Sequence, residues 1–389
     1  MLPLRRLLTG LAPALLAPLL VLLPHAATAV PTPPPLANKA WLLVDYDSGK
    51  VLGESNAQAR VAPASLTKMM TSYLIEQALE TGRLKETDPV FVSEHAWCRG
   101  TSKESCMYLP LNSQASVIDM LRGVIIQSGN DASKALAEHM AGSEPAFAEL
   151  MNKEAARLGM KGTHFMNATG LPDPNHYTTA FDLAVLARSI IRDSAHYYPI
   201  YSEKEFTFHN IKQGNRNALL FTDPTVDGLK TGHTEEAGYC LVASSKRGNM
   251  RLISVVMGTK SMQERADQTR ALFNWGFANF ESATVQNAGG VLATPKVWFG
   301  MAPLVKAGLD RDFVLTLPRG QKDKLKTELV LAPEVEAPIA KGQELGQVNV
   351  TLDGNVIASQ PLVAMEAVEE AGFLTRLWHR ITRFFSHLF

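Results

Sequence analysis

The chain has 389 residues, of which 46% are hydrophobic and 20% are charged, and its formal net charge is zero. This length allows two or three domains with a sizeable hydrophobic core. The balanced charge excludes a general attraction to nucleic acid. The three cysteines and ten histidines show no zinc-ligand spacing, so we expect no metal and no cofactor.

Residues 1–29 have the pattern of a secretory signal peptide. Arg5 and Arg6 precede an apolar stretch, Leu11–Leu23, and the small residues Ala27-Thr28-Ala29 follow it. A charged start, an apolar middle and a small-x-small end are typical of a segment removed on export. A retained anchor helix is the alternative, but the apolar run is short and interrupted by prolines. We therefore expect the mature chain to work outside the cytoplasm, with a proline-rich linker at 30–39.

A β-hairpin and a helix are predicted next. Ala40–Asp45 and Lys50–Glu54 have strand patterns, and a helical pattern runs from Ser65 to about Leu79. Residues three apart on a helix lie on one face, so the Ser65 hydroxyl and the Lys68 amine can meet. Serine becomes a nucleophile when a base removes its proton, and lysine is such a base only when its amine is kept neutral. Alone, the pair also fits a serine near a helix N-cap followed by a solvated lysine.

Two cysteines flank a polar loop after a short predicted strand at Val90–Ser93. In an oxidising compartment, Cys98 and Cys106 could form a disulfide. Two free thiols are the alternative, and the spacing does not decide between them. Cys240 lies in an apolar run and is expected to pack in the core.

A helical block occupies the middle of the chain, and strands return after it. Helical periodicity is found at Ser116–Ile126, Asp131–His139, Phe147–Leu158, Thr178–Arg192 and Thr269–Phe280. Strand patterns are found at Phe206–Phe208, Gly238–Ser244 and Leu252–Met257. Strands on both sides of a helical block indicate one α+β domain, 40–283, whose sheet uses both ends of the segment.

Two further segments follow this domain. Short strand-like pieces punctuated by Gly and Pro indicate a small all-β domain at 284–368, with strands at Lys296–Phe299, Phe313–Leu317, Glu328–Leu331 and Gln347–Leu352. In the last segment, 371–389, bulky apolar residues recur three and four apart beside arginines. Such a helix is typical of an anionic membrane surface and is too short and charged to span it. Docking onto its own protein or onto a membrane partner are the alternatives.

Three short motifs occur in a fixed order: Ser65-x-x-Lys68, Ser128-Gly129-Asn130 on the turn between two helices, and Lys230-Thr231-Gly232 ahead of the Gly238 strand. This order resembles the signature of the serine penicillin-recognising enzymes. Within them, the chain is similar to the low-molecular-mass penicillin-binding proteins of the D-alanyl-D-alanine carboxypeptidase family. Further segments that carry the resemblance are Phe165–Pro172, Val226–Thr234, Thr294–Gly300 and Leu317–Gln321, and the tail resembles the family's membrane anchor.

Each motif has a chemical role under this resemblance. Ser65 attacks a carbonyl and forms an acyl-enzyme, Lys68 takes its proton, and Ser128 relays a proton to the leaving amine. Asn130 holds Lys68 and the substrate backbone. The substrate carboxylate is expected at Lys230 and Thr231. Gly232 is expected to leave room for the substrate backbone.

Three more residues are expected at the site. Arg216 and Arg265 fall where the family places arginines, which would pair with a free carboxylate, although surface salt bridges are the alternative. The backbone N–H groups of Ser65 and His233 are the expected oxyanion hole.

The resemblance implies removal of the terminal D-alanine from peptidoglycan pentapeptide stems at the periplasmic face of the inner membrane, with β-lactams acylating the same serine. A β-lactamase would need a glutamate that activates water, and none is found between Leu158 and Thr179. A D,D-endopeptidase acting on cross-links stays open. A silent penicillin-binding scaffold is disfavoured because all three motifs are intact.

Overall fold

The computed structural model describes residues 30–99 and 104–386. The predicted signal peptide, 1–29, lies outside the described residues.

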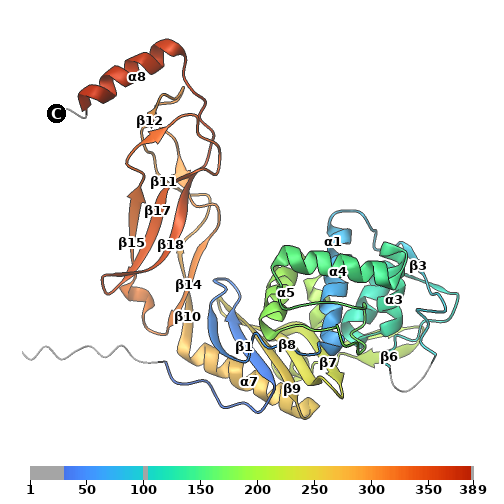
Figure 1. The fold of residues 1–389 in the computed structure, drawn as a ribbon. Helices are drawn as coiled ribbons and strands as arrows, with labels where there is room; N and C mark the ends of the chain where they lie inside the picture. The colour runs from blue at the N-terminus through green and yellow to red at the C-terminus, as the bar shows by residue number, and fades with distance from the viewer. Residues whose placement is uncertain (1–29, 100–103, 387–389) are drawn as a thin grey trace, which may run out of the picture. The chain divides into compact units, whose positions relative to one another are not determined.

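Five antiparallel strands form the central sheet, in the order β2-β1-β9-β8-β7. Their bounds are β1 Ala40–Asp45, β2 Val51–Ser55, β7 Val226–Thr234, β8 Gly238–Arg247 and β9 Met250–Thr259. Strands from both ends of the segment thus meet in one sheet, and the predicted α+β class is confirmed (Figure 1). The sequence patterns predicted no strand at β7, which forms one edge of this sheet.

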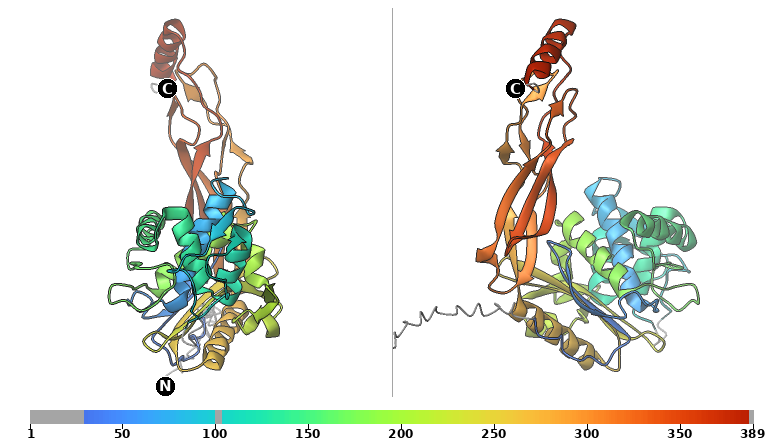
Figure 2. Two further views of the ribbon diagram at one scale, coloured as in Figure 1. Left: turned by 90° about the vertical axis from the view of Figure 1, so that its right-hand side faces the viewer. Right: turned by 60° about the vertical axis from the view of Figure 1, so that its left-hand side comes forward.

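Helices cover both faces of this sheet (Figure 2). One face packs against α7 (Met262–Asn279) and the other against α5 (Ala180–Asp193). A Cβ at Gly276 of α7 would lie 2.7 Å from the side chains of Leu43 and Leu252, so the glycine lets α7 lie close to the sheet. Alternate side chains of β1 point to opposite faces.

The helical block contains η1 (Ala64–Thr67), α1 (Lys68–Glu80), α2 (Val117–Arg122), the π-helical turn η2 (Gly123–Gln127), α3 (Asn130–Ala141) and α4 (Glu144–Leu158). Side-chain N-caps set several helix starts. The hydroxyl of Ser143 accepts from Ala146 N, and that of Ser261 accepts from Glu264 N. Because of these caps, α4 and α7 begin before the apolar periodicity that predicted them.

Short elements connect the main ones. Strands β3 (Pro89–Phe91) and β4 (Gln114–Ser116) pair with each other, as do β5 (Glu205–Phe208) and β6 (Ile211–Gly214). Two single-turn pieces, η3 (Tyr198–Ser202) and α6 (Leu219–Thr222), lead toward β7.

The C-terminal part is built from strands. One sheet has the order β11-β13-β18-β17-β15, and two strand pairs accompany it, β10-β14 and β12-β16. The bounds are β10 Phe280–Gln286, β11 Val291–Ala293, β12 Val297–Trp298, β13 Ala307–Gly308, β14 Phe313–Pro318, η4 Lys322–Lys324, β15 Lys326–Leu331, β16 Val335–Glu336, β17 Glu344–Leu352 and β18 Asn355–Ala364. This part has a hydrophobic core of its own, so the predicted all-β domain is confirmed.

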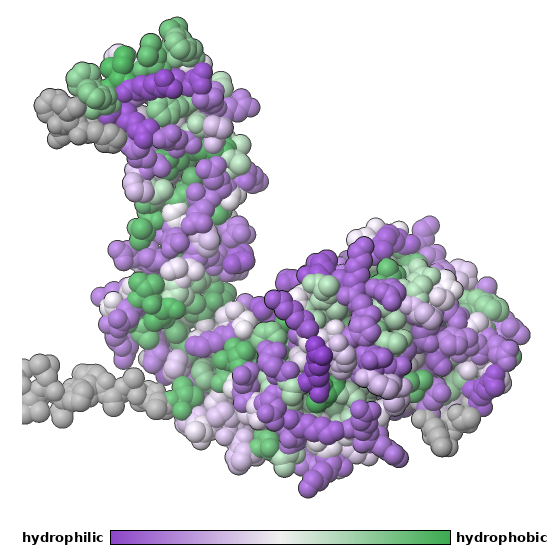
Figure 3. Space-filling model, viewed as in Figure 1, coloured by the Kyte–Doolittle hydropathy of each residue, from purple (hydrophilic) through white to green (hydrophobic). Residues whose placement is uncertain are grey.

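The last helix, α8 (Phe373–Ser386), keeps most of its large apolar side chains exposed. Figure 3 shows apolar residues gathered along it. Arg376 pairs with Glu370, and Arg383 pairs with Glu334 and Glu336. Within residues 30–99 and 104–386, no helix combines the length and the apolar character that crossing a membrane requires.

Candidate active site

The serine and the lysine of the first motif lie at the junction of two helical turns. Ser65 is in the 3-10 turn η1, and Lys68 is the first residue of α1, so the α-helix begins three residues later than predicted. Residues three apart in a 3-10 turn are nearly eclipsed. The Lys68 amine accordingly lies 3.2 Å from the Ser65 hydroxyl oxygen.

Two glycines let backbone segments pack directly against this serine turn. Gly170 has a φ of +84°, and a Cβ there would overlap the Ala64 carbonyl oxygen. A Cβ at Gly232 would lie 3.1 Å from the Pro63 carbonyl oxygen and 3.2 Å from the backbone nitrogen of Leu66. The absent side chain of Gly232 thus leaves room for η1, which is a different reason from the expected one. Both contacts fix the position of the turn that carries Ser65.

Burial sets the protonation state of Lys68. Its side chain is 0% exposed, and its amine lies 2.7 Å from the Asn130 Oδ1 atom and 2.6 Å from the Thr169 carbonyl oxygen. Burial, helped by the positive charge of Arg216, lowers the Lys68 pKa from 10.5 to about 7. A neutral amine has two N–H groups, which match these two oxygens. Its lone pair then accepts from the Ser65 hydroxyl, as a general base requires.

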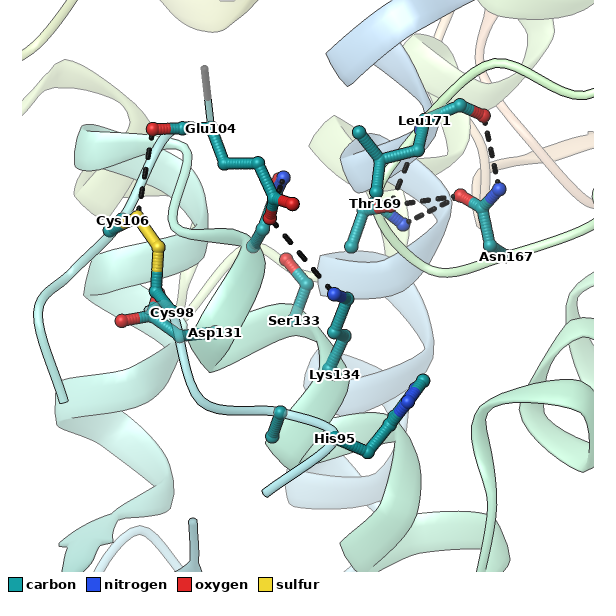
Figure 4. Close-up of polar contacts among 12 residues, drawn as sticks. His95, Cys98, Glu104, Cys106, Asp131, Ser133, Lys134, Asn167, Thr169 and Leu171 are labelled. Atoms are coloured by element: carbon teal, nitrogen blue, oxygen red, sulfur yellow. Dashed lines mark hydrogen bonds and ion pairs between the residues drawn. A yellow bond between two sulfur atoms is a disulfide. The ribbon is translucent and has the colours of Figure 1, made fainter. Parts of the chain in front are cut away.

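The Thr169 carbonyl is a part of the site that sequence analysis did not assign. The Asn167 Oδ1 atom accepts from the backbone N–H groups of Thr169 and Gly170, at 3.1 and 2.7 Å, and so shapes this turn (Figure 4). The Thr71 hydroxyl donates to the Ala168 carbonyl at 2.7 Å. The segment was singled out by resemblance alone, and only the fold shows that its backbone holds the lysine.

The second motif lies between η2 and α3. Ser128 has a φ of 61°, in the left-handed region that is costly for serine. Its hydroxyl is buried and has no hydrogen-bond partner among the described residues, so it is available to a bound substrate. The side-chain amide of Asn130 connects two groups: its oxygen accepts from Lys68, and its Nδ2 donates to Glu104 at 3.1 Å.

The third motif lies within β7, at the edge of the sheet beside η1. Lys230 is 3% exposed, and its amine donates to the Thr231 carbonyl at 3.3 Å. Burial lowers the Lys230 pKa well below its usual range, and the charges of Lys68, Arg216 and Arg265 act in the same direction. The motif therefore places buried cationic groups close together.

Two arginines extend this positive cluster. Arg265 of α7 is buried and donates to the carbonyls of Gly232, Cys240 and Arg216, at 3.2, 3.5 and 3.4 Å. Burial lowers its pKa to about 10. Arg216 donates to the Ser105 hydroxyl at 2.8 Å. Neither arginine has a carboxylate partner within the described ranges, so the surface salt bridges considered above do not form there.

One cleft joins these motifs. It has a volume of about 370 Å³ and is lined by Ser65, Glu104, Ser105, Ser128, Arg216, Thr231, Gly232, His233, Tyr239, Met262 and Arg265. The His233 ring is exposed and stacks on Tyr239, with ring centroids 3.9 Å apart. Glu104, Ser105, Tyr239 and Met262 were not expected, because no motif of their own marks them.

The cysteine loop forms part of the cleft edge. Cys98 and Cys106 are joined by a disulfide, with Cα atoms 6.1 Å apart, and Glu104 and Ser105 directly precede Cys106. Cys240 is a buried free thiol, as expected of a core residue.

A serine beside a buried lysine whose pKa is lowered toward 7, at a cationic cleft edge, is the arrangement expected of a serine hydrolase of the penicillin-recognising class. A family model described as D-alanyl-D-alanine carboxypeptidase matches residues 27–261. A second, described as the penicillin-binding protein 5 C-terminal domain, matches residues 280–370. The chain therefore belongs to the D-alanyl-D-alanine carboxypeptidase family, and it is an enzyme of the serine hydrolase type.

Individual relatives agree with this placement. D-alanyl-D-alanine carboxypeptidase DacA of Haemophilus influenzae is 48% identical over 351 residues, which cover 89% of each chain. DacA of Escherichia coli K12 is 44% identical over 367 residues, covering 93% of this chain and 91% of the relative. The crystal structure of penicillin binding protein 5 from H. influenzae has a TM-score of 0.82 and 47% identity, covering 87% of this chain and 99% of that one.

Proposed function

We propose that this enzyme removes the terminal D-alanine from peptidoglycan pentapeptide stems through an acyl intermediate on Ser65, and that β-lactams acylate the same residue. The observation that carries the proposal is the buried Lys68 amine, 3.2 Å from the Ser65 hydroxyl and with a pKa lowered to about 7. The names of the relatives, carboxypeptidase and penicillin binding protein, support both halves of it.

The acylation step follows from the contacts of these residues. Lys68 takes the Ser65 proton as the oxygen attacks the carbonyl of the penultimate D-alanine. The backbone N–H groups of Ser65 and His233 stabilise the oxyanion. When the C–N bond breaks, Ser128 passes its proton to the departing amine and receives one from the Lys68 ammonium. D-Alanine leaves, and water later hydrolyses the ester with Lys68 again as base.

The cationic cluster selects the substrate end. A free C-terminal carboxylate would lie near Thr231 and the positive charges of Lys230, Arg216 and Arg265. These cations lack carboxylate partners among the described residues, so a bound carboxylate would relieve their mutual repulsion. A chain without a free terminus would leave that charge uncompensated, which explains a preference for cutting at the end of a peptide.

Labelled penicillin and a D-Ala-D-Ala peptide test the proposal on the purified protein. We expect one penicilloyl group on Ser65, slow release of that group, and D-alanine release from the peptide. Ser65→Ala should abolish all three, while Ser202→Ala, which changes an exposed serine, should not. Rapid penicillin turnover would instead indicate a β-lactamase, and cleavage of cross-linked peptide dimers, supplied as a third substrate, would indicate an endopeptidase. An adduct on another residue would refute the assignment of Ser65.

We further propose that residues 1–29 are a removed signal peptide, 30–39 a linker, 40–283 the catalytic domain, 284–368 the C-terminal β domain and 371–389 a membrane-surface helix. The enzyme would then act at the periplasmic face of the inner membrane. The support is the exposed apolar side of α8, which includes Phe373, Leu374 and Trp378. An amphipathic helix of this kind lies in the interface between lipid and water.

The charges of α8 refine this proposal. Arg376 and Arg383 are paired with glutamates of the same protein, which leaves them less available to anionic headgroups. We therefore expect apolar burial to supply most of the binding and anionic lipid to add only about 1 kcal/mol, through exposed Arg380. A chain ending at Ala371 should be active and soluble, and should not sediment with vesicles. If it still sediments, the anchor is elsewhere.

A further inference from the structure

Glu104 is held at the edge of the cleft by a well-anchored segment. The disulfide joins Cys98 to Cys106, and the Ser105 carbonyl accepts from the backbone N–H of Asn130 at 2.7 Å. The Asp131 carboxylate accepts from the backbone N–H groups of Met107 and Leu109, at 2.8 and 3.0 Å. These contacts attach the segment after Glu104 to the first turn of α3, the helix that also carries Asn130.

The carboxylate of Glu104 lies one hydrogen bond away from the catalytic network. Its Oε2 atom accepts from the Asn130 Nδ2 atom at 3.1 Å. The same Oε2 atom lies 4.0 Å from the Lys134 amine (Figure 4). Its side chain is 30% exposed, whereas that of Lys134 is 15% exposed. The lysine therefore approaches it from the protein side, and part of the carboxylate stays open to the cleft that Ser65 also lines.

Charge is distributed unevenly along this cleft. Arg216 and Arg265 line it and Lys230 lies beside it, and together they form the proposed site for the substrate's terminal carboxylate. Among the described residues that line the cleft, Glu104 is the one acidic side chain. It lies on the side of Asn130, the residue that would bind the backbone before the scissile bond. A substrate would thus place its anionic end near the arginines and its preceding side chain near Glu104.

We propose that Glu104 is a specificity-determining residue that favours substrates with a cationic group on the residue preceding D-Ala-D-Ala and disfavours those with an anionic group there. This inference rests on the proposed function. Asn130 Nδ2 has two hydrogens, so one can bind Glu104 while the other binds a substrate carbonyl. That carbonyl brings the adjoining side chain to the carboxylate. An ammonium group would gain a charge-assisted contact, and a carboxylate would meet repulsion.

Three penicillins that differ at one carbon test the proposal on the intact protein. Benzylpenicillin is neutral at its benzylic carbon, ampicillin carries an ammonium group there, and carbenicillin carries a carboxylate. Acylation rate constants would be measured by mass spectrometry for the wild type, Glu104→Gln and Glu94→Gln. Glutamine keeps the size of the side chain and its acceptor for Asn130. Glu94 pairs with Arg99 at an exposed position and does not line the cleft, so it controls for the loss of one negative charge from the protein.

We expect Glu104→Gln to lower the ratio of ampicillin to carbenicillin acylation by about fivefold, the effect of one partly solvated charge. Glu94→Gln should leave the ratio unchanged. A peptide arm uses a D-Ala-D-Ala tripeptide that begins with lysine, with its side-chain amine free or acetylated. The wild type should prefer the free amine in kcat/KM, and Glu104→Gln should lose the preference.

Two results would overturn the inference. An equal change in all three penicillins would mean that Glu104 only positions Asn130, and an unchanged ratio would mean that its charge is not sensed. Both leave the proposed function standing, because benzylpenicillin would still acylate Ser65. Absence of any adduct on wild-type Ser65 would remove the proposed function and, with it, this inference.

Discussion

The protonation of Lys68 gives the sharpest quantitative prediction. An ordinary lysine with a pKa of 10.5 is neutral in about one molecule in three thousand at pH 7. With its pKa lowered to about 7, Lys68 is neutral in about half of the molecules. Burial thus raises the amount of active base by about a thousandfold. Acylation of Ser65 should rise with pH, with a midpoint near 7, because only the neutral amine accepts the proton.

The substitution Lys68→Arg tests this prediction. It keeps the positive charge, but a guanidinium stays protonated at any working pH. Loss of the general base should lower the acylation rate by about 10²–10⁴-fold and abolish the rise with pH. Lys153→Arg, at an exposed position on α4, should change neither.

The assay is the rate of adduct formation with a saturating labelled penicillin, followed by intact mass from acidic to alkaline pH. Thermal unfolding of each variant shows whether the fold is retained. A wild-type rate that is flat across this range would refute the reasoning, since it would mean that Lys68 does not titrate in it. So would a folded Lys68→Arg variant within tenfold of wild type.

Three further predictions concern stability. Gly170→Ala should lower the free energy of unfolding by about 2–4 kcal/mol and slow acylation, because its Cβ would overlap the serine turn. Gly142 has nearly the same φ but open space around it, so Gly142→Ala should lower the free energy of unfolding in urea by only about 1 kcal/mol. Burial raises the Glu76 pKa from 4.5 to about 7, so the folded state loses stability as the pH rises through this range. The free energy of unfolding of Glu76→Gln should therefore rise relative to wild type by up to about 3 kcal/mol between pH 5 and 8. A difference between the two proteins that does not change with pH would contradict this. Replacing Cys98 and Cys106 by serine should cost at most about 2–3 kcal/mol and should blunt the discrimination between ampicillin and carbenicillin; unchanged discrimination would show that the disulfide does not hold Glu104.

Most of the fold was predictable because its elements have strong local patterns. The hairpin strands at Ala40–Asp45 and Lys50–Glu54 and the helix at Thr178–Arg192 have clear local patterns, and their observed bounds differ from the predicted ones by at most two residues. The strand β7 was missed because the motif Lys230-Thr231-Gly232 is not an apolar alternation. Its strand conformation comes from pairing with β8, which is a long-range contact.

The site likewise has a part that the sequence predicted and a part that it did not. Short motifs marked Ser65, Lys68, Ser128 and Lys230, because the chemistry requires those residue types at fixed spacing. The Thr169 carbonyl and the Glu104 carboxylate were not marked. Any residue supplies a carbonyl, so a main-chain ligand leaves no signal in the side chain. A lone glutamate in a polar loop likewise has no pattern that separates it from a solvated one.

The same features that make the site reactive also make it costly to fold. Lys68 and Lys230 are buried amines whose pKa values are lowered mainly by burial, and Ser128 adopts a left-handed backbone conformation. For Lys68 alone, holding the ammonium form in the folded site costs about 5 kcal/mol relative to water. Folding therefore favours the neutral amine below its ordinary pKa of 10.5, which is the form that the proposed mechanism requires. The lowered pKa and the stability cost both come from the burial of Lys68. A variant that exposes the Lys68 amine to water should therefore be more stable at acidic pH and less active.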